Sequence, residues 1–238
     1  MDDSIHTLKR WIEQSENIVF FGGAGVSTES GIQDFRSVDG LYNQKYAYPP
    51  ETILSHTFFM AKPEAFYKFY HDRMIVDGVK PNKAHNRLAE LERAGKLKAV
   101  VTQNIDGLHQ LAGSQKVLEL HGSIHRNTCM NCEKRYGYEA VSKSAGVPRC
   151  VCGGIIRPDV VLYEEGLDTD VINEAVRCIR EADVLIVGGT SLVVYPASGL
   201  INYYNGNKLV LINKGATGYD SKADLLISEK IGEVFAQV

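Results

Sequence analysis

The sequence predicts an α/β protein: a mainly parallel sheet with helices on both faces, plus a helical insertion and a small metal-binding unit. Short apolar runs alternate with helix-length segments along most of the 238 residues. Parallel strands connected by helices produce this alternation. Glycine or polar residues follow several of the apolar runs, and one cysteine-containing stretch interrupts the pattern.

The first half of the chain supplies a helix, a strand and the insertion. Apolar residues recur at helical spacing over 5–16, and the apolar run 18–21 indicates a buried parallel strand that leads into glycines. The aromatic-rich segment 37–84 has no regular alternation and is predicted to be mostly helical. Its later part forms an amphipathic pattern that begins at Pro63, a residue favoured in the first turn of a helix.

The remaining elements alternate as a parallel sheet requires. We expect helices over 84–94, near 168–181, after Pro196 and near 229–237, and strands over 98–101, 117–120, 184–187 and 208–212.

Composition excludes several classes of protein. Apolar residues make up 44% of the chain and charged residues 23%, which is typical of globular proteins rather than disordered or fibrous ones. The net charge of −3 gives no reason to expect nucleic acid or an anionic membrane as a partner. The apolar run 18–21 is too short for a signal peptide or a membrane span. We therefore expect a cytoplasmic protein, and a monomer.

Four of the five cysteines form two close pairs, Cys129 with Cys132 and Cys150 with Cys152. Four thiolates at such spacing suit a closed tetrahedral zinc site, which leaves no position for a catalytic water. The second pair has a one-residue spacer, so its turn must be tight, and the glycines at 153–154 supply the backbone freedom. The alternative is a set of free thiols or a redox pair.

Glycines follow the first strand in the sequence Gly23-Ala24-Gly25-Val26-Ser27-Thr28. Such a loop lets the backbone approach a pyrophosphate at a helix N-terminus, although glycine also occurs in such turns for steric reasons alone. Two departures argue against a common dehydrogenase. Thr28 replaces the third glycine, and no acidic strand end follows about 20 residues later.

Polar residues follow two later strands. The segment 102–109 reads Thr-Gln-Asn-Ile-Asp-Gly-Leu-His, and His121-Gly122 follows the next apolar run. Open α/β folds keep their chemistry at the carboxyl edge of the sheet, where these residues would lie. The ordinary pKa of histidine, near 6.5, suits a general base at neutral pH. A lone histidine is more often a core or surface residue, so His121 depends on its neighbours for this interpretation.

Together these segments resemble the sirtuin family of NAD-dependent protein deacylases, in its bacterial deacetylase-type branch. The matching segments are GAGVS, Gly31-Ile-Gln-Asp-Phe-Arg36, TQNID, His121-Gly122, GTSL at 189–192 and the cysteine quartet. The resemblance runs from about residue 10 to about 231. It implies an enzyme that consumes NAD as a co-substrate, carries structural Zn²⁺ and acts on acetylated-lysine proteins or peptides. The implied products are deacetylated lysine, nicotinamide and O-acetyl-ADP-ribose.

The composition of the segments, together with the resemblance, implies a division of the chain. Residues 1–36, 85–122 and 159–238 would form a Rossmann-like NAD-binding domain, 37–84 the helical insertion, and 123–158 the zinc-binding small domain.

Roles at the reacting centre follow from the resemblance. The acyl oxygen would attack the nicotinamide ribose, and His121 would deprotonate the ribose hydroxyls. Asp106 and Ile105 would hold the nicotinamide carboxamide. Asn104 would orient water beneath the ribose, and Gln103 would bind the ribose itself.

The same family pattern assigns the rest of the NAD site. Ala24 and Thr28 would line the pyrophosphate, Arg36 would contact the phosphate–ribose region and Phe35 would cover the nicotinamide. The adenosine end would meet Thr190, Ser191 and Asn213, with Ile231 against the adenine. Core packing is the plain alternative for Phe35, and loop capping for each hydroxyl or amide side chain taken alone.

The sequence indicates the substrate-binding residues less clearly than it indicates the NAD and zinc sites. Segments around Val161 and Val193 resemble those that pair with an extended substrate peptide. Tyr70 and Arg73 match a Tyr-x-x-Arg pattern of sirtuins that remove succinyl and malonyl groups, and on a helix they would share one face. Such a pair is also common on amphipathic helices, so we expect acetyl-lysine to be preferred.

Two other functions fit parts of this pattern. Mono-ADP-ribosyl transfer or NAD hydrolysis would use the same NAD pocket without an acyl acceptor. A non-catalytic NAD sensor would bind a partner protein, but it would have no need of His121 as a base. The sequence favours the deacetylase.

Overall fold

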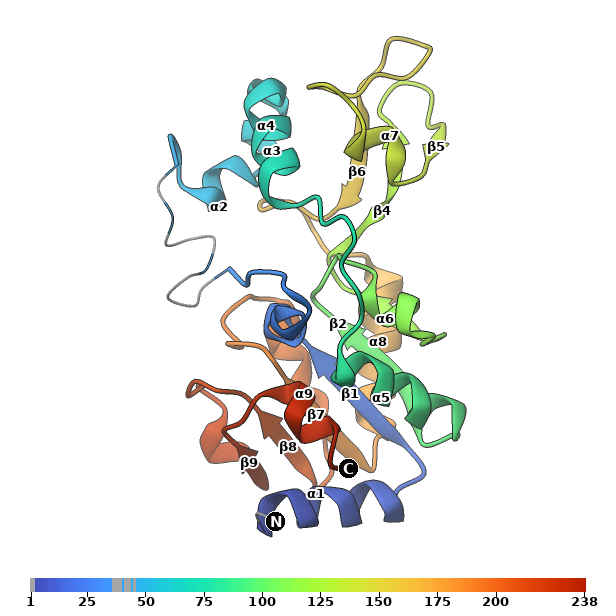
Figure 1. Ribbon diagram of the computed structural model, residues 1–238, viewed down its shortest axis with the longest axis vertical. Helices are drawn as coiled ribbons and strands as arrows, with labels where there is room; N and C mark the ends of the chain where they lie inside the picture. Colours follow the sequence, from blue (N-terminus) through green and yellow to red (C-terminus); the bar gives the residue numbers. More distant parts are fainter. Residues whose placement is uncertain (1–2, 36–39, 41–43, 45) are drawn as a thin grey trace.

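The computed structural model describes residues 3–35, 40, 44 and 46–238. Its lower part in Figure 1 is a six-stranded sheet with the order β3-β2-β1-β7-β8-β9, in which every neighbouring pair is parallel. The strands are β1 (Ile18–Gly22), β2 (Leu97–Thr102), β3 (Val117–Glu119), β7 (Val184–Gly188), β8 (Leu209–Ile212) and β9 (Leu225–Ile227). The predicted parallel sheet is confirmed, with β9 as an edge strand that sequence analysis missed.

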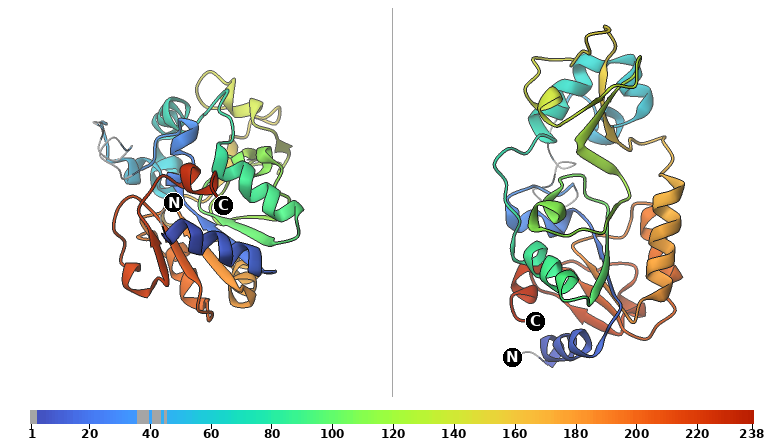
Figure 2. Two further views of the ribbon diagram at one scale, coloured as in Figure 1. Left: turned by 60° about the horizontal axis from the view of Figure 1, so that its bottom comes forward. Right: turned by 90° about the vertical axis from the view of Figure 1, so that its right-hand side faces the viewer.

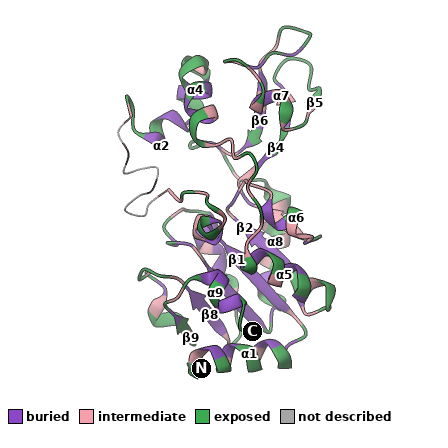
Figure 3. Ribbon diagram, in the orientation of Figure 1, coloured by how far each residue is buried: buried purple, intermediate pink, exposed green. Residues whose placement is uncertain are grey.

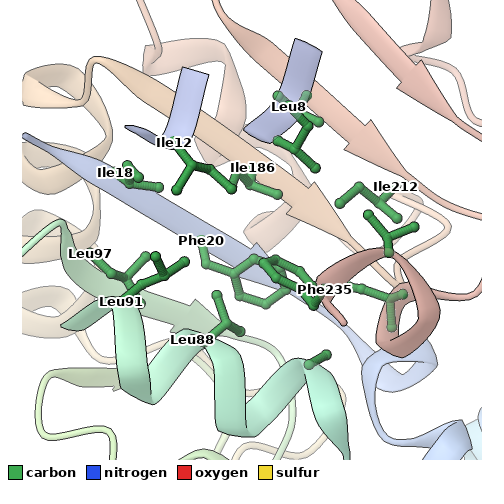
Figure 4. Packing of buried hydrophobic residues seen from close by; sticks show 14 of the residues in the cluster. Leu8, Ile12, Ile18, Phe20, Leu88, Leu91, Leu97, Ile186, Ile212 and Phe235 are labelled. Atoms are coloured by element: carbon green, nitrogen blue, oxygen red, sulfur yellow. The ribbon is translucent and has the colours of Figure 1, made fainter. Parts of the chain in front are cut away.

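Helices cover both faces of this sheet because successive side chains of a strand point to opposite sides. Phe20 of β1 packs in a core with α1 (Asp3–Gln14), α5 (Lys83–Arg93) and α9 (Ile231–Phe235). Figure 4 shows Leu88 and Phe235 beside Phe20, with Leu8 further away in the same cluster. Phe21 packs on the other face, against α8 (Thr169–Glu181) and the 3₁₀ helix η4 (Ala197–Tyr203). All five residues of β1 are buried, and so are all or most residues of β2, β7 and β8; Figure 3 draws buried residues in purple.

The helix expected after Pro196 is 3₁₀ rather than α. Within it the Asn202 side-chain amide donates to the Gly199 carbonyl at 3.2 Å. Such a side-chain bond competes with the backbone bond of a regular helix.

The upper part combines short helices with a second sheet. The helices are α2 (Pro50–Ile53), α3 (His56–Ala61), α4 (Pro63–Arg73) and α7 (Glu139–Ser142). The antiparallel sheet has the order β5-β4-β6, with β4 (Gly122–Cys129), β5 (Arg135–Tyr136) and β6 (Ile156–Val160). The predicted helix beginning at Pro63 is confirmed.

The helices α2–α4 and the small sheet share one hydrophobic cluster. The Tyr67 hydroxyl of α4 also donates to the Ile156 carbonyl of β6 at 2.6 Å. The region predicted as an insertion and the region predicted as a zinc unit therefore pack against each other, above the main sheet in Figures 1 and 2. Among the described residues, no helix is both long and apolar enough to cross a membrane.

Candidate functional site

A cavity of about 830 Å³ lies between the two parts of the molecule. Residues that follow β1, β2, β7 and β8 line one side of it, and residues of α4 and the end of β6 line the other. Parallel sheets bring the carboxyl ends of their strands to one edge, where ligand crevices form. The sequence-predicted site residues that border this cavity are Ala24, Thr28, Phe35, Tyr70, Arg73, Gln103, Asn104, Ile105, Asp106, His121, Val161, Thr190, Ser191, Asn213 and Ile231.

Two of the residues predicted to bind NAD or substrate are not among them. Arg36 lies outside the described residues. Val193 does not border the cavity, and the residue is 56% exposed.

The glycine loop differs from the expected helix N-terminus. After β1 the chain forms two 3₁₀ turns, η1 (Ala24–Val26) and η2 (Thr28–Ser30), instead of an α-helix. The Gly25 N–H donates to the Gly189 carbonyl at 2.7 Å, and a Cβ on Gly25 would lie 2.8 Å from Gly189 Cα. Close packing of two backbone segments thus requires glycine here, independently of any ligand.

Ser27 joins the two polar side chains of the Gln-Asn-Ile-Asp segment. Its hydroxyl donates to Asp106 Oδ2 at 2.7 Å and accepts from Asn104 Nδ2 at 3.0 Å. The Leu108 N–H donates to the other carboxylate oxygen of Asp106 at 2.9 Å. Ser27 is only 1% exposed, so water competes little for these bonds. The sequence-based prediction did not assign a role to Ser27.

His121 presents one ring nitrogen as a base. Its Nδ1 lies 2.9 Å from the Gln103 carbonyl oxygen. A carbonyl oxygen only accepts, so Nδ1 carries the proton and Nε2 keeps its lone pair. Burial lowers the pKa of His121 below its ordinary value, against the smaller opposing effect of this hydrogen bond. The imidazole is therefore neutral at pH 7 and able to accept a proton at Nε2.

Polar atoms at the cavity fit the expected NAD. Gln103 Nε2 is a buried donor with no hydrogen-bond partner among the described residues, and Gln103 borders the cavity. Buried donors are rarely left unpaired, so a ligand oxygen is a suitable partner.

Glu29, also at the cavity, accepts from the Gly232 N–H at 2.9 Å and so ties the glycine loop to α9, which carries Ile231. Sequence analysis assigned Glu29 no role.

The four predicted cysteines come together at the end of β4. Their Sγ atoms all lie within 4.8 Å of one another. The pair Cys129 and Cys152 is separated by 3.5 Å, and the pair Cys132 and Cys150 by 3.6 Å. Tetrahedral zinc with Zn–S bonds of about 2.3 Å places its sulfurs about 3.8 Å apart. The quartet therefore fits a closed zinc site, and Gly153 takes a left-handed conformation in the tight turn.

Tyr70 and Arg73 lie at the cavity but in different surroundings. Tyr70 is fully buried, its hydroxyl has no partner among the described residues, and burial raises its pKa above the ordinary value. Arg73 is exposed, and its guanidinium carbon lies 5.6 Å from the centre of the Tyr46 ring. The phenol and the guanidinium therefore border the same cavity, one buried and the other exposed.

Comparison with known proteins agrees with this site. Residues 23–196 match the model of the Sir2 family. An "NAD-dependent protein deacetylase" of Clostridium acetobutylicum is 62% identical over 99% of this chain and 98% of its own length. A relative of the same description from Clostridium perfringens is 60% identical over 100% of this chain and 99% of its own.

Solved structures give the same result. A Sir2 structure with a p53 peptide and NAD⁺ is 41% identical, with a TM-score of 0.88, over 98% of this chain and 96% of that one. Another, with a deacetylated p53 peptide and 3′-O-acetyl-ADP-ribose, has a TM-score of 0.90 at 40% identity, over the same shares of the two chains. The chain belongs to the Sir2 family.

Proposed function

We propose that this protein is an NAD-dependent protein-lysine deacetylase that yields deacetylated lysine, nicotinamide and O-acetyl-ADP-ribose. The observation that carries the proposal is the neutral His121 with its free Nε2, bordering the same cavity as the network of Ser27, Asn104 and Asp106. A base beside hydrogen-bonding groups that hold a nucleotide is what acyl transfer to a ribose hydroxyl requires. Family membership and the names of the relatives support it.

Bound NAD supplies the electrophilic ribose carbon and the hydroxyl that receives the acyl group. His121 Nε2 takes the proton of that hydroxyl, and the Gln103 carbonyl stabilises the imidazolium through Nδ1–H. Asp106, with Ile105, binds the nicotinamide carboxamide, and Asn104 orients water and polar groups beneath the ribose. Phe35 covers the nicotinamide and excludes water from it.

The four cysteines hold zinc in a structural role. All four ligand positions are thiolates, so the site offers no place for a substrate or a water. We also propose the division predicted from the sequence, with the NAD-binding domain at 1–36, 85–122 and 159–238. A cytoplasmic location and a monomeric state complete the proposal. A reducing compartment would keep the thiolates available to the metal.

The substrate is an acetylated-lysine protein or peptide. Val161 lies where the chain leaves β6, and its N–H donates to the His121 carbonyl at 3.0 Å. Val161 and Val193 would pair with the substrate backbone as an added strand, which gives affinity with little demand on sequence. One similar Sir2 structure is described as "bound to acetylated peptide", and another holds a p53 peptide with NAD⁺.

Mass spectrometry of an acetyl-lysine peptide incubated with and without NAD tests this function. We expect the peptide to lose its acetyl group and O-acetyl-ADP-ribose to form, and both only when NAD is present. Free ADP-ribose with an unchanged peptide would instead support NAD hydrolysis, and ADP-ribose attached to protein would support ADP-ribosyl transfer. Binding of NAD without any product would support the sensor.

Removal of carboxyl-bearing acyl groups is a second candidate, favoured by one observation. The buried Tyr70 hydroxyl has no partner among the described residues, and Arg73 borders the same cavity. An acyl carboxylate could accept from both groups. The position of Arg73 beside the Tyr46 ring supports instead a packing role for its side chain. We therefore propose acetyl-lysine as the preferred substrate.

A further inference from the structure

The strand that connects the proposed base to the zinc site has an interruption in its pairing. β4 begins directly after His121 and ends at Cys129. Its register against β6 shifts between Ser123 and Asn127, so the three residues between them leave the ladder. Bulges of this kind occur beside active sites, where they redirect a side chain toward a neighbouring segment.

The released residues contact the loop that follows β2. The Ile124 N–H donates to the Ile105 carbonyl at 3.0 Å. His125 Nε2 lies 2.9 Å from the Asp106 carbonyl oxygen. Because a carbonyl oxygen only accepts, Nε2 carries the proton and donates it to this bond. The bulge thus turns two successive residues of β4 toward the proposed nicotinamide-binding loop.

The imidazole of His125 also packs against Gly107. Gly107 has a φ of 72°, and a Cβ there would lie 2.6 Å from His125 Cδ2. Both the left-handed backbone and the imidazole therefore favour glycine at this position. The rings of His125 and Tyr138 are 5.1 Å apart, and the Tyr138 hydroxyl donates to Asp77 at 3.0 Å. The imidazole therefore packs against a tyrosine ring that is itself anchored to Asp77.

We propose that His125 is a positioning residue that fixes the main chain of Asp106 from the zinc-binding side. This role rests on the proposed function, in which the Asp106 side chain holds the nicotinamide carboxamide. Ser27 and the Leu108 N–H fix the two carboxylate oxygens of Asp106, and His125 fixes its carbonyl. Loss of the His125 N–H loosens the end of the site that retains nicotinamide, while the acyl-lysine end stays as it is.

Two substitutions separate the hydrogen bond from the packing. His125→Phe keeps a ring against Gly107 and Tyr138 but removes the donor. His125→Gln keeps an N–H donor at a similar reach. Thr128→Val is the control on the same strand, because it removes only the hydroxyl that donates to Asp159 at 3.0 Å.

The measured quantities are the inhibition constant of nicotinamide, the KM for NAD and the KM for an acetyl-lysine peptide. Because His125→Phe loses one hydrogen bond, it is expected to raise the nicotinamide inhibition constant and the KM for NAD by about 3- to 10-fold. The KM for the peptide should stay within about twofold of the wild-type value. His125→Gln should restore both NAD-side constants to near the wild-type values. Thr128→Val should leave all three unchanged, and zinc should stay at one per chain in every variant.

Hydrogen exchange gives a readout that does not depend on activity. Amides of 105–108 should exchange faster in His125→Phe than in wild type or Thr128→Val, because the loop opens more often. Suppose the wild type is active, and His125→Phe has the same nicotinamide inhibition constant and the same amide exchange rates as the wild type. That result would overturn the positioning role of His125 and leave the proposed function standing. So would equal changes in His125→Phe and Thr128→Val. A wild type without NAD-dependent deacetylation would overturn the proposed function and this role with it.

Discussion

Ser27→Ala is the substitution whose effect the structure defines most closely. The hydroxyl makes two bonds, one to the Asp106 carboxylate at 2.7 Å and one from the Asn104 amide at 3.0 Å. A hydrogen bond to a charged group contributes about 1.5–3 kcal/mol and a neutral one about 0.5–1.5 kcal/mol. Their sum, about 2–4.5 kcal/mol, is the upper limit of the loss, because water can enter and replace part of these contacts.

The loss divides between folding stability and reaction rate. We expect kcat/KM for NAD to fall by about 10- to 100-fold, which corresponds to about 1.4–2.7 kcal/mol. The KM for an acetyl-lysine peptide should change by less than about twofold, since the acyl-lysine end of the cavity does not involve this network. Steady-state kinetics with each substrate varied in turn, together with thermal unfolding, measures both parts.

Ser15→Ala is the matched control. Ser15 is also 1% exposed, but its hydroxyl has no hydrogen-bond partner among the described residues, and it precedes β1 at the opposite end of the strand from the glycine loop. Its removal should leave kcat/KM for NAD unchanged. The reasoning would be refuted if Ser27→Ala kept wild-type kcat/KM for NAD, or if Ser15→Ala lowered it equally.

Three further predictions concern other parts of the molecule. Purified protein should contain one zinc per chain by elemental analysis, and protein without zinc would contradict the assignment. Cys150→Ser should unfold the small sheet, while far-ultraviolet circular dichroism should keep most of the signal of the main sheet. Arg73→Met should leave acetyl-peptide kinetics nearly unchanged and cost about 1.5–3 kcal/mol only toward a succinyl peptide. A wild-type preference for succinyl-peptide that Arg73→Met abolishes would overturn the proposed acetyl preference. Burial lowers the pKa of His85 to about 4 and that of His109 well below its ordinary value, so the unfolded chain binds more protons than the folded one below about pH 6.5. The free energy of unfolding should therefore decrease as the pH falls from 6.5 toward 4, and denaturant titrations showing less decrease in wild type than in His85→Gln would contradict this assignment.

Local sequence patterns were sufficient for much of the main sheet. Apolar runs and the glycines or polar residues after them predicted β1, β2, β7 and β8, because these strands are buried on both faces. The missed strand β9 is an apolar run of only three residues, Leu225–Ile227, and Leu226 within it is 43% exposed. An apolar run this short fits a loop or a helix as well as a strand, so its pattern alone did not identify it.

The site also contains residues that local sequence patterns could predict and residues that they could not. His121 and the Gln-Asn-Ile-Asp segment follow predicted strands, so the edge where they meet could be expected. Ser27 could not be assigned a role, because its partners lie 77 and 79 residues further along the chain and only the fold brings them together. The contact of His125 depends on a bulge in β4, which no spacing in the sequence indicates.

The most direct test of the central claim is the stoichiometry of one reaction, followed by chromatography and mass spectrometry. With NAD and an acetyl-lysine peptide, the account predicts equal amounts of deacetylated peptide, nicotinamide and O-acetyl-ADP-ribose. His121→Ala should still bind NAD but form these products at least about 10²-fold more slowly, the usual effect of losing a general base. Nicotinamide released without deacetylated peptide, or a near wild-type rate in His121→Ala, would contradict the account.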